Sequence, residues 1–176
     1  FVGEVLAWRH GMLESTDVEL SGLPDDIDKS IICFVDAWRD ACAQMENGAL
    51  PTRTVLSAER LRQWRDDICI YEYQLIREDF LVRIDAPTII ENNGESFQNS
   101  TPREIDLKYG TCLMAALLKT MRQKKPTFHY VRIVSASGEP RQWLRVLLPV
   151  QTFDRFGDPI DQILGVRFAY EPMHCI

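Results

Sequence analysis

Few side chains in this 176-residue sequence have a type and spacing that could perform chemistry. The histidines, His10, His129 and His174, stand far apart, and the aspartates and glutamates are scattered. No pair of them suggests a general acid and a general base. The sequence also lacks the G-x-S-x-G, phosphate-loop and H-E-x-x-H motifs. We therefore expect that the protein is not an enzyme.

The five cysteines are odd in number and include no C-x-x-C pair. They are Cys33, Cys42, Cys69, Cys112 and Cys175. We interpret them as reduced thiols of a cytoplasmic protein, because disulfides persist in oxidising compartments. Their spacing does not favour a structural zinc site, and we expect no metal.

Composition restricts the classes of partner. The net charge is −6 at neutral pH, so no overall basic field favours nucleic acid, and we expect none as a partner. No apolar run is long enough to span a bilayer, so we expect no membrane segment. Residues 1–15 include Glu4, Arg9 and His10 and lack the apolar core of a signal peptide.

The C-terminal stretch organises the predicted fold. Trp143–Val150 and Ile160–Tyr170 are rich in β-branched, aromatic and other apolar residues, which predicts two strands. The segment between them, Asp154–Pro159, contains the residues that favour a wide turn. Strands this apolar have both faces at least partly covered.

Before these strands, the pattern predicts a helix over Asp26–Met45 that begins near Asp25 and ends at Asn47-Gly48. Its apolar stripe packs either on the domain's own core, which we favour, or on a second subunit as well. The stripe consists of Ile27, Ile31, Val35, Trp38, Cys42 and Met45.

The middle of the chain alternates between strand and helix signals. Ile68–Leu75 and Phe80–Asp85 predict a hairpin, and Thr127–Ser135 predicts a further strand. Thr88–Asn92 reads as one helical turn, and Tyr109–Lys125 as a longer helix.

A further helix start is expected where Thr101, Pro102 and Glu104 form a capping box. Short turns between neighbouring strands imply antiparallel pairing. The order of elements therefore predicts an α+β domain with helices segregated to one sheet face.

Three sequence pieces resemble PAS domains, specifically the subgroup common in alphaproteobacteria as a nearly isolated domain. They are LPTRTVLSAERLRQW, FLVRIDAPTIIENNG and LLPV…GDPIDQILG, within residues 50–172. The chain departs at Ala86-Pro87, where the family usually has Gly-Thr, and at Asn99-Ser100, where it usually has Thr-Gly. These departures fall in the helical wall of the family's usual ligand cavity.

The resemblance implies a five-stranded antiparallel sheet ordered 2-1-5-4-3, with Ile160–Tyr170 central and helices enclosing a cavity. It also implies a bacterial sensor or interaction role, and we expect a homodimer. We divide the chain into an N-terminal extension with an amphipathic helix (1–50), a PAS-like domain (51–172) and a tail (173–176).

No cofactor is expected in that cavity. Tyr109–Lys125 contains no histidine for haem, and the Asn-Cys-Arg-Phe-Leu-Gln motif of flavin photoreceptors is absent. Four side chains could still give the cavity polar contacts to a ligand: Tyr73, Arg83, Tyr109 and His129. Each of them also has an ordinary structural role available, as a core tyrosine, an exposed strand arginine or a satisfied histidine.

Two functions follow from these observations. The first is a sensory module that binds a small molecule, and the second is a protein-interaction or dimerisation module with a packed core. No kinase, cyclase or DNA-binding segment follows residue 172, so we expect any signal to pass to a partner protein by contact.

Arginines on neighbouring strands suggest one more feature. With a two-residue turn at Ser137-Gly138, Arg132 would face Trp143, and Arg145 and Arg167 would extend a cationic row across the sheet. Such a row needs counter-charge, since like charges on neighbouring strands repel. The predicted N-terminal helix could supply it from three aspartates, Asp28, Asp36 and Asp40.

Overall fold

The computed structural model describes residues 15–134 and 138–171. The apolar segment at residues 5–8, part of the predicted turn at residues 137–138, and the tail 173–176 lie outside these ranges.

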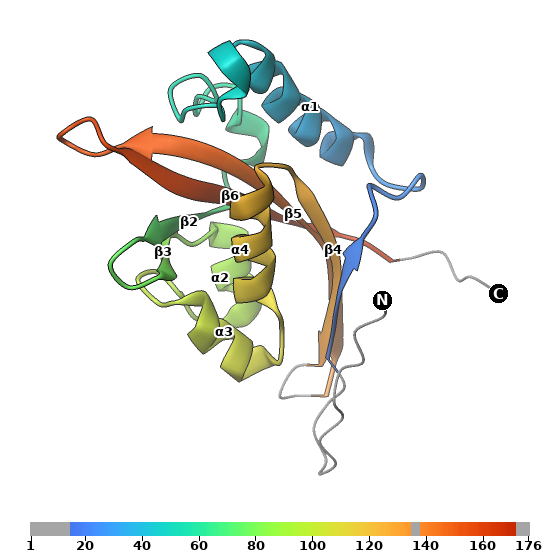
Figure 1. Cartoon of the computed structure of the whole chain (residues 1–176). Helices are drawn as coiled ribbons and strands as arrows, with labels where there is room; N and C mark the ends of the chain where they lie inside the picture. The colour runs from blue at the N-terminus through green and yellow to red at the C-terminus, as the bar shows by residue number, and fades with distance from the viewer. Residues whose placement is uncertain (1–14, 135–137, 172–176) are drawn as a thin grey trace.

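Six antiparallel strands form one sheet in the order β1-β4-β5-β6-β2-β3 (Figure 1). Their bounds are β1 Thr16–Leu20, β2 Ile68–Gln74, β3 Asp79–Ile84, β4 Thr127–Val134, β5 Pro140–Phe153 and β6 Pro159–Ala169. Without β1, this is the predicted order 2-1-5-4-3, and β6 lies inside the sheet as predicted.

The sixth strand corrects the expectation of five. β1 pairs with β4 along its whole length, from Thr16 opposite Arg132 to Leu20 opposite Phe128. Its sequence, TDVEL, carries two carboxylates, and Val18 is exposed. Polar contacts, described below, hold β1 in place, so the apolar alternation that would predict a strand is missing.

Four α-helices cover the two faces of the sheet (Figure 1). They are α1 Lys29–Ala43, α2 Pro87–Asn93, α3 Pro102–Tyr109 and α4 Leu113–Gln123, with short 3₁₀ turns η1 at Glu46–Gly48 and η2 at Arg62–Trp64. Helices α2 to α4 pack on one face, and α1 packs on the opposite face. Each face therefore has its own apolar core, and the interior strands contribute to both.

Helix α1 begins later than predicted. Asp28, rather than Asp25 or Asp26, caps it by accepting a hydrogen bond from the Ser30 amide at 2.7 Å. Phe34 and Val35 are fully buried, and the Trp38 indole N–H donates to the carbonyl of Pro149 at 2.7 Å. The apolar side of α1 thus packs on the chain's own core.

The predicted helix Tyr109–Lys125 is wrong at its start. Tyr109 is the last residue of α3, and Gly110 follows with a positive φ of 66°. Asp106 then accepts hydrogen bonds from the amides of Leu113 at 2.7 Å and Met114 at 2.9 Å, which begins a new helix. The capping box of Thr101 and Glu104 is confirmed.

The register between β4 and β5 differs by one residue from the predicted register. Val131, not Arg132, lies opposite Trp143, because five residues (135–139) connect Val134 to its partner Pro140 instead of two. Arg132 therefore lies on the other face from Arg145. The expected docking of α1 aspartates on this row is also wrong, since α1 covers the opposite face and Arg145 pairs with Asp17.

Candidate functional site

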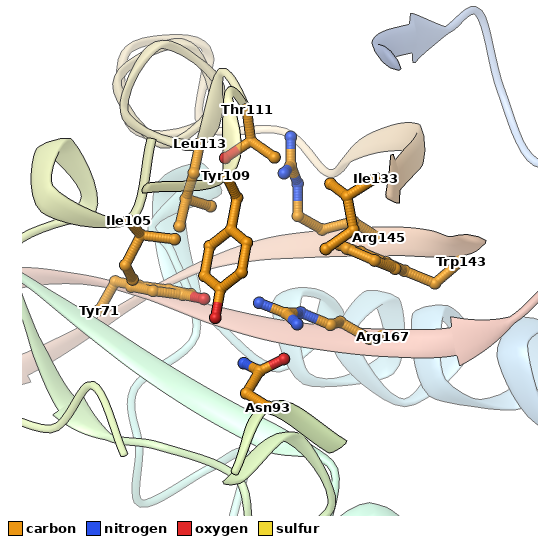
Figure 2. A pocket seen from close by; sticks show the side chains of 10 residues that line it. All are labelled: Tyr71, Asn93, Ile105, Tyr109, Thr111, Leu113, Ile133, Trp143, Arg145 and Arg167. Carbon is orange, nitrogen blue, oxygen red and sulfur yellow. The ribbon is translucent and has the colours of Figure 1, made fainter. Parts of the chain in front are cut away.

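A small polar cavity lies between the sheet and the helices α2 to α4 (Figure 2). Its volume open to the centre of a water-sized sphere is about 20 Å³, which is room for roughly one water molecule. Its lining residues are Tyr71, Asn93, Ile105, Tyr109, Thr111, Leu113, Ile133, Trp143, Arg145 and Arg167.

An open cleft of about 520 Å³ adjoins this cavity between α2 and the ends of β5 and β6. The two spaces share Asn93, Trp143 and Arg167 as lining residues. Arg141 also lines the cleft, and its guanidinium donates to the carbonyl of Asn92. The cleft therefore gives solvent access to the polar side chains of the cavity.

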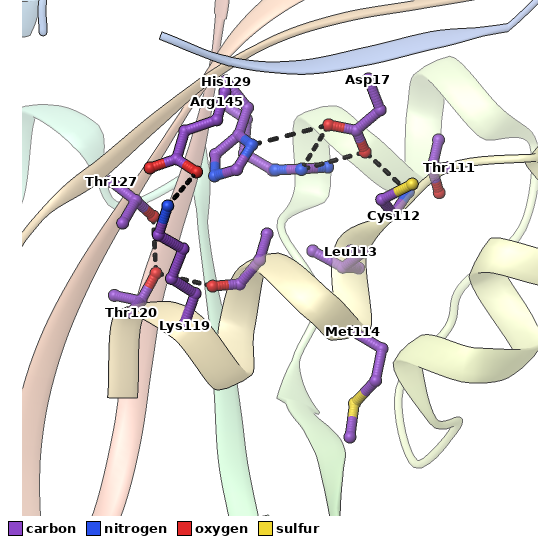
Figure 3. A network of polar contacts seen from close by, with 12 residues as sticks. Asp17, Thr111, Cys112, Leu113, Met114, Lys119, Thr120, Thr127, His129 and Arg145 are labelled. Carbon is purple, nitrogen blue, oxygen red and sulfur yellow. Dashed lines mark hydrogen bonds and ion pairs between the residues drawn. The ribbon is translucent and has the colours of Figure 1, made fainter. Parts of the chain in front are cut away.

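Arg145 is the most buried charge at the site, with 4% of its surface exposed. Its Nη2 donates to both carboxylate oxygens of Asp17, at 2.8 and 3.0 Å (Figure 3). The Asp17 side chain is itself only 2% exposed, and it also accepts a hydrogen bond from the Cys112 amide at 2.8 Å. Asp17 thus joins β1 to both the sheet and the start of α4.

Two further contacts hold β1 against the helices. The Ser15 hydroxyl donates to the carbonyl of Gly110 at 2.7 Å, and Lys119 forms an ion pair with Glu19 at 2.5 Å. These contacts explain how a short, acidic strand is fixed at the sheet edge.

His129 lies beneath β1, where its Nδ1 is 3.7 Å from an oxygen of Asp17. Burial, followed by the positive charge of Arg145, lowers the pKa of His129 to about 4. The imidazole is therefore neutral at neutral pH, and its contact with Asp17 is not an ion pair. His129 belongs to the buried cluster under β1 and does not line the cavity.

Arg167 lies directly opposite Arg145 on β6, on the same side of the sheet. Its guanidinium stacks on the Trp143 ring, 4.7 Å from the ring centroid. Figure 2 shows it pointing toward the hydroxyl groups of Tyr71 and Tyr109. Among the residues that the structure describes, no hydrogen bond or ion pair joins this guanidinium.

Three buried N–H groups that line the cavity have no hydrogen-bond partner in the described part of the chain. They are Nδ2 of Asn93, Nε1 of Trp143 and Nε of Arg145. A buried donor without a partner is costly, so a cluster of three is unusual in a merely structural core.

The structure places only one of the four predicted ligand-binding residues at this cavity. Tyr109 lines it, and its hydroxyl donates to Glu95 at 3.3 Å. Tyr73 packs edge-on against Phe80 at the rim of the core, and Arg83 is 49% exposed and pairs with Glu72 at 3.3 Å. Ligand roles for these residues stay predictions.

Sequence reasoning missed four residues of this site. Arg145 and Arg167 were recognised as a cationic row but not as cavity residues, because the row depends on strand register. Asn93 was read only as part of a helix stop, and Trp143 only as a strand residue. The Asn93-Gly94 stop could have pointed to the site, because it sets the last helical side chain against the strand ends.

Two absences apply to the described residues, 15–134 and 138–171. No group of His, Cys, Asp or Glu in them could hold a metal ion. No helix among them has the length and apolar character needed to cross a membrane.

Comparisons with known proteins give few relatives. No protein-family model and no curated protein matches the chain. One similar solved structure, titled as an RNA-binding Light-Oxygen-Voltage receptor, has 11% identity and a TM-score of 0.43 and covers 89% of this chain. The chain spans 38% of that receptor's length.

A second similar structure comes from a study of a flavin analogue and the Light-Oxygen-Voltage domain mechanism. It has 12% identity and a TM-score of 0.41 and covers 65% of this chain and 84% of its own. Both TM-scores are too low to carry an argument. The chain's own strand order and helix-covered face therefore define its class, a PAS-like α+β fold.

Proposed function

We propose that this chain is a sensory or regulatory PAS-like module that binds a small molecule and signals through protein contacts. The observation that carries the proposal is the cluster of three unpartnered buried N–H groups at the inner end of an accessible cleft. A ligand with acceptor atoms would satisfy these groups, and its binding would connect α2 to the interior strands β5 and β6.

The proposed ligand is smaller than a flavin. The cavity has room for roughly one water molecule, since the Tyr71 ring fills the space above β6. A Cβ atom at Gly165 would lie 2.8 Å from that ring, which shows how closely ring and strand pack. These residues do not fit a three-ring cofactor, although the similar structures are named for flavin-based photoreception.

Residues 51–172 form the proposed sensory unit, and residues 1–50 are an extension that contributes β1 and α1. The assignment to the alphaproteobacterial PAS subgroup, a cytoplasmic location and a non-enzymatic role are parts of the same proposal. The contacts of β1 with Cys112 and Lys119 support a role for the extension near the ligand cavity.

Native mass spectrometry of the purified chain and thermal shifts with a chemically diverse library test this function. We expect at least one compound to raise the melting temperature of the parent. The variant Asn93→Trp should abolish that effect by filling the junction of cleft and cavity. The matched variant Gln63→Trp, at an exposed position in η2, should retain it. Binding that survives Asn93→Trp would contradict the proposed location.

A second candidate function is a protein-interaction or dimerisation module. Exposed apolar side chains at two turns favour it: Leu75 and Ile76 between β2 and β3, and Phe153 and Phe156 at the β5–β6 turn. The pairing of β2 with β6 brings these turns to the same end of the sheet (Figure 1). Such apolar groups on a surface favour protein contacts.

For this candidate, we propose a homodimer formed through the turns. Light scattering should then give a dimer mass for the parent and a monomer mass for Ile76→Lys/Phe156→Lys. Arg77→Glu, at an exposed position in the same turn, is the matched control for a charge change without apolar loss. A monomer mass for the parent would contradict the homodimer.

A further inference from the structure

We propose that the cavity binds the carboxylate group of a small organic acid, held by Arg167 and by the N–H groups of Asn93 and Trp143. This inference rests on the proposed small-molecule function and adds the chemical class of the ligand. It follows from the charges, donors and space at the junction of cavity and cleft.

The charge argument begins with the two arginines that face each other across β5 and β6. Like charges on directly opposite strand residues destabilise a sheet unless a counter-charge is present. Asp17 supplies it for Arg145, at 2.8 Å. Arg167 has no carboxylate within ion-pair distance among the described residues and is held by stacking on Trp143.

Two other carboxylates near the site have different partners. Asp106 accepts from Thr111 and from the first amides of α4, as described above, although the Arg145 charge also acts on it. Asp67 lines the outer cleft, where it accepts from the Thr88 hydroxyl at 2.8 Å. An added anion is therefore the counter-charge that Arg167 lacks.

The unpartnered atoms define the second requirement, which is hydrogen-bond acceptors. Asn93 Nδ2, Trp143 Nε1 and Arg145 Nε are all donors, and they line the same cavity as Arg167. A carboxylate offers two oxygens with about four acceptor positions and no donor. A neutral amide would bring donors of its own, and a cation would be repelled by both arginines.

The available space favours a carboxylate over a larger oxyanion. The inner cavity takes roughly one water-sized group, whereas the adjoining cleft has about 520 Å³ for the remainder of a ligand. A flat carboxylate can enter edge-on beside the planar guanidinium of Arg167, and such pairing is among the stronger charge-assisted contacts. The apolar walls of the cleft, Ile89 and Phe168, suit a hydrocarbon group behind it.

The first test uses butyrate and benzoate as probes, with butyramide and benzamide as neutral controls and inorganic phosphate as a second anion. Thermal shift and titration calorimetry are run on the full chain at low salt. We expect both carboxylates to bind and to raise the melting temperature, and the amides and phosphate to do neither. Equal binding of a carboxylate and its amide, or binding of phosphate alone, would overturn the inference.

The second test changes the proposed contacts. Arg167→Gln should weaken carboxylate binding by about tenfold or more, because it removes a charge-assisted contact. Arg132→Gln, a charge loss at an exposed position on β4, should leave binding unchanged. If Arg167→Gln does not fold, Arg167→Lys serves instead, and we expect weaker binding because lysine lacks the planar fork. Binding unaffected by the Arg167 change would overturn the inference.

The third test supplies the missing carboxylate from the chain itself. Asn93→Asp should raise the melting temperature of the ligand-free protein at low salt and remove the response to butyrate and benzoate. A lower melting temperature with an unchanged response would overturn the inference. If neutral compounds from the library bind in a manner sensitive to Asn93→Trp, the proposed function stands and only the carboxylate assignment fails. If nothing from the library or the panel binds, both fail.

Discussion

Asp17 is the residue on which the buried polar cluster depends. Its carboxylate accepts from Arg145 and from the Cys112 amide and lies near His129, although the side chain is nearly inaccessible to solvent. Removing one member of a buried ion pair leaves the other charge without compensation, which costs more than the pair contributes. The cluster therefore offers direct tests at single positions.

We expect Asp17→Asn to lower the free energy of unfolding by about 3 kcal/mol, because Arg145 keeps its charge in a buried position. Urea denaturation measures this loss. The double variant Asp17→Asn/Arg145→Met should be less damaged than the single one, since it leaves no unpaired charge. A double variant with the summed loss of both single changes would contradict this account.

The pH dependence of stability should contain a contribution from His129. Its folded-state pKa of about 4 lies below the ordinary value of 6.5, so the unfolded chain binds a proton first as the pH falls. This contribution is fully present above pH 6.5 and is lost between about pH 6.5 and pH 4. The loss is of the order of 3 kcal/mol.

Urea denaturation at a series of pH values measures the His129 contribution. His129→Gln keeps a polar side chain that does not titrate, so its stability should fall less than that of the parent over the same pH range. Parallel curves for parent and variant would show that His129 does not carry the effect.

At the scale of elements, local signals were read correctly and tertiary ones were not. The capping box of α3 was predictable because Thr101 and Glu104 bond within one turn. The break before α4 was not, since its cap, Asp106, lies seven and eight residues before the amides that it accepts. β1 was missed for a related reason, because its contacts are with Gly110, Cys112 and Lys119, far along the chain.

The cap supplied by Asp106 can be tested through α4. We expect Asp106→Ala to cost about 1–2 kcal/mol of stability, the range for loss of a helix cap. Amide hydrogen exchange should quicken at Leu113 and Met114, whose N–H groups bond to Asp106, and stay slow at Leu117 inside the helix. Asp106→Asn keeps one acceptor oxygen and should give an intermediate result, whereas unchanged exchange in Asp106→Ala would contradict the cap.

The docking of α1 depends on Trp38, which is 8% exposed and bonded to the Pro149 carbonyl. Trp38→Asp should destabilise the protein by more than about 3 kcal/mol, because it removes a large apolar side chain and buries a charge. Trp38→Phe should cost about 1 kcal/mol for the lost hydrogen bond. Thermal melting measures both, and a Trp38→Asp variant as stable as the parent would show that α1 does not pack as described.

For the whole molecule, the sequence predicted strand order better than it predicted the site. The apolar content of Ile160–Tyr170 was enough to place β6 inside the sheet, because an interior strand has both faces covered. The cavity depends instead on register, where one residue decides which face Arg145 occupies. Register follows from the length of the β4–β5 connection, which residue patterns did not fix.

The two cores share their strands, so we expect the described chain to unfold as one cooperative unit. Leu148 and Leu164 face α1, whereas Leu147 and Ile163, their neighbours on β5 and β6, face α4. Losing either helical layer would expose a face of the same two strands. This expectation bears on the proposed division at residue 50, because α1 belongs to the extension but packs on strands of the PAS-like domain.

Tryptophan fluorescence can follow each face separately during urea unfolding. In a Trp8→Phe background, Trp143→Phe leaves Trp38 and Trp64, which report the α1 face. Trp38→Phe/Trp64→Phe leaves Trp143, which reports the cavity face. Within each variant, we expect the fluorescence midpoint to coincide with the midpoint measured by circular dichroism, since one transition melts both faces. An earlier fluorescence transition confined to the α1-face reporter would mean that the extension unfolds on its own and that the boundary at residue 50 separates two folding units.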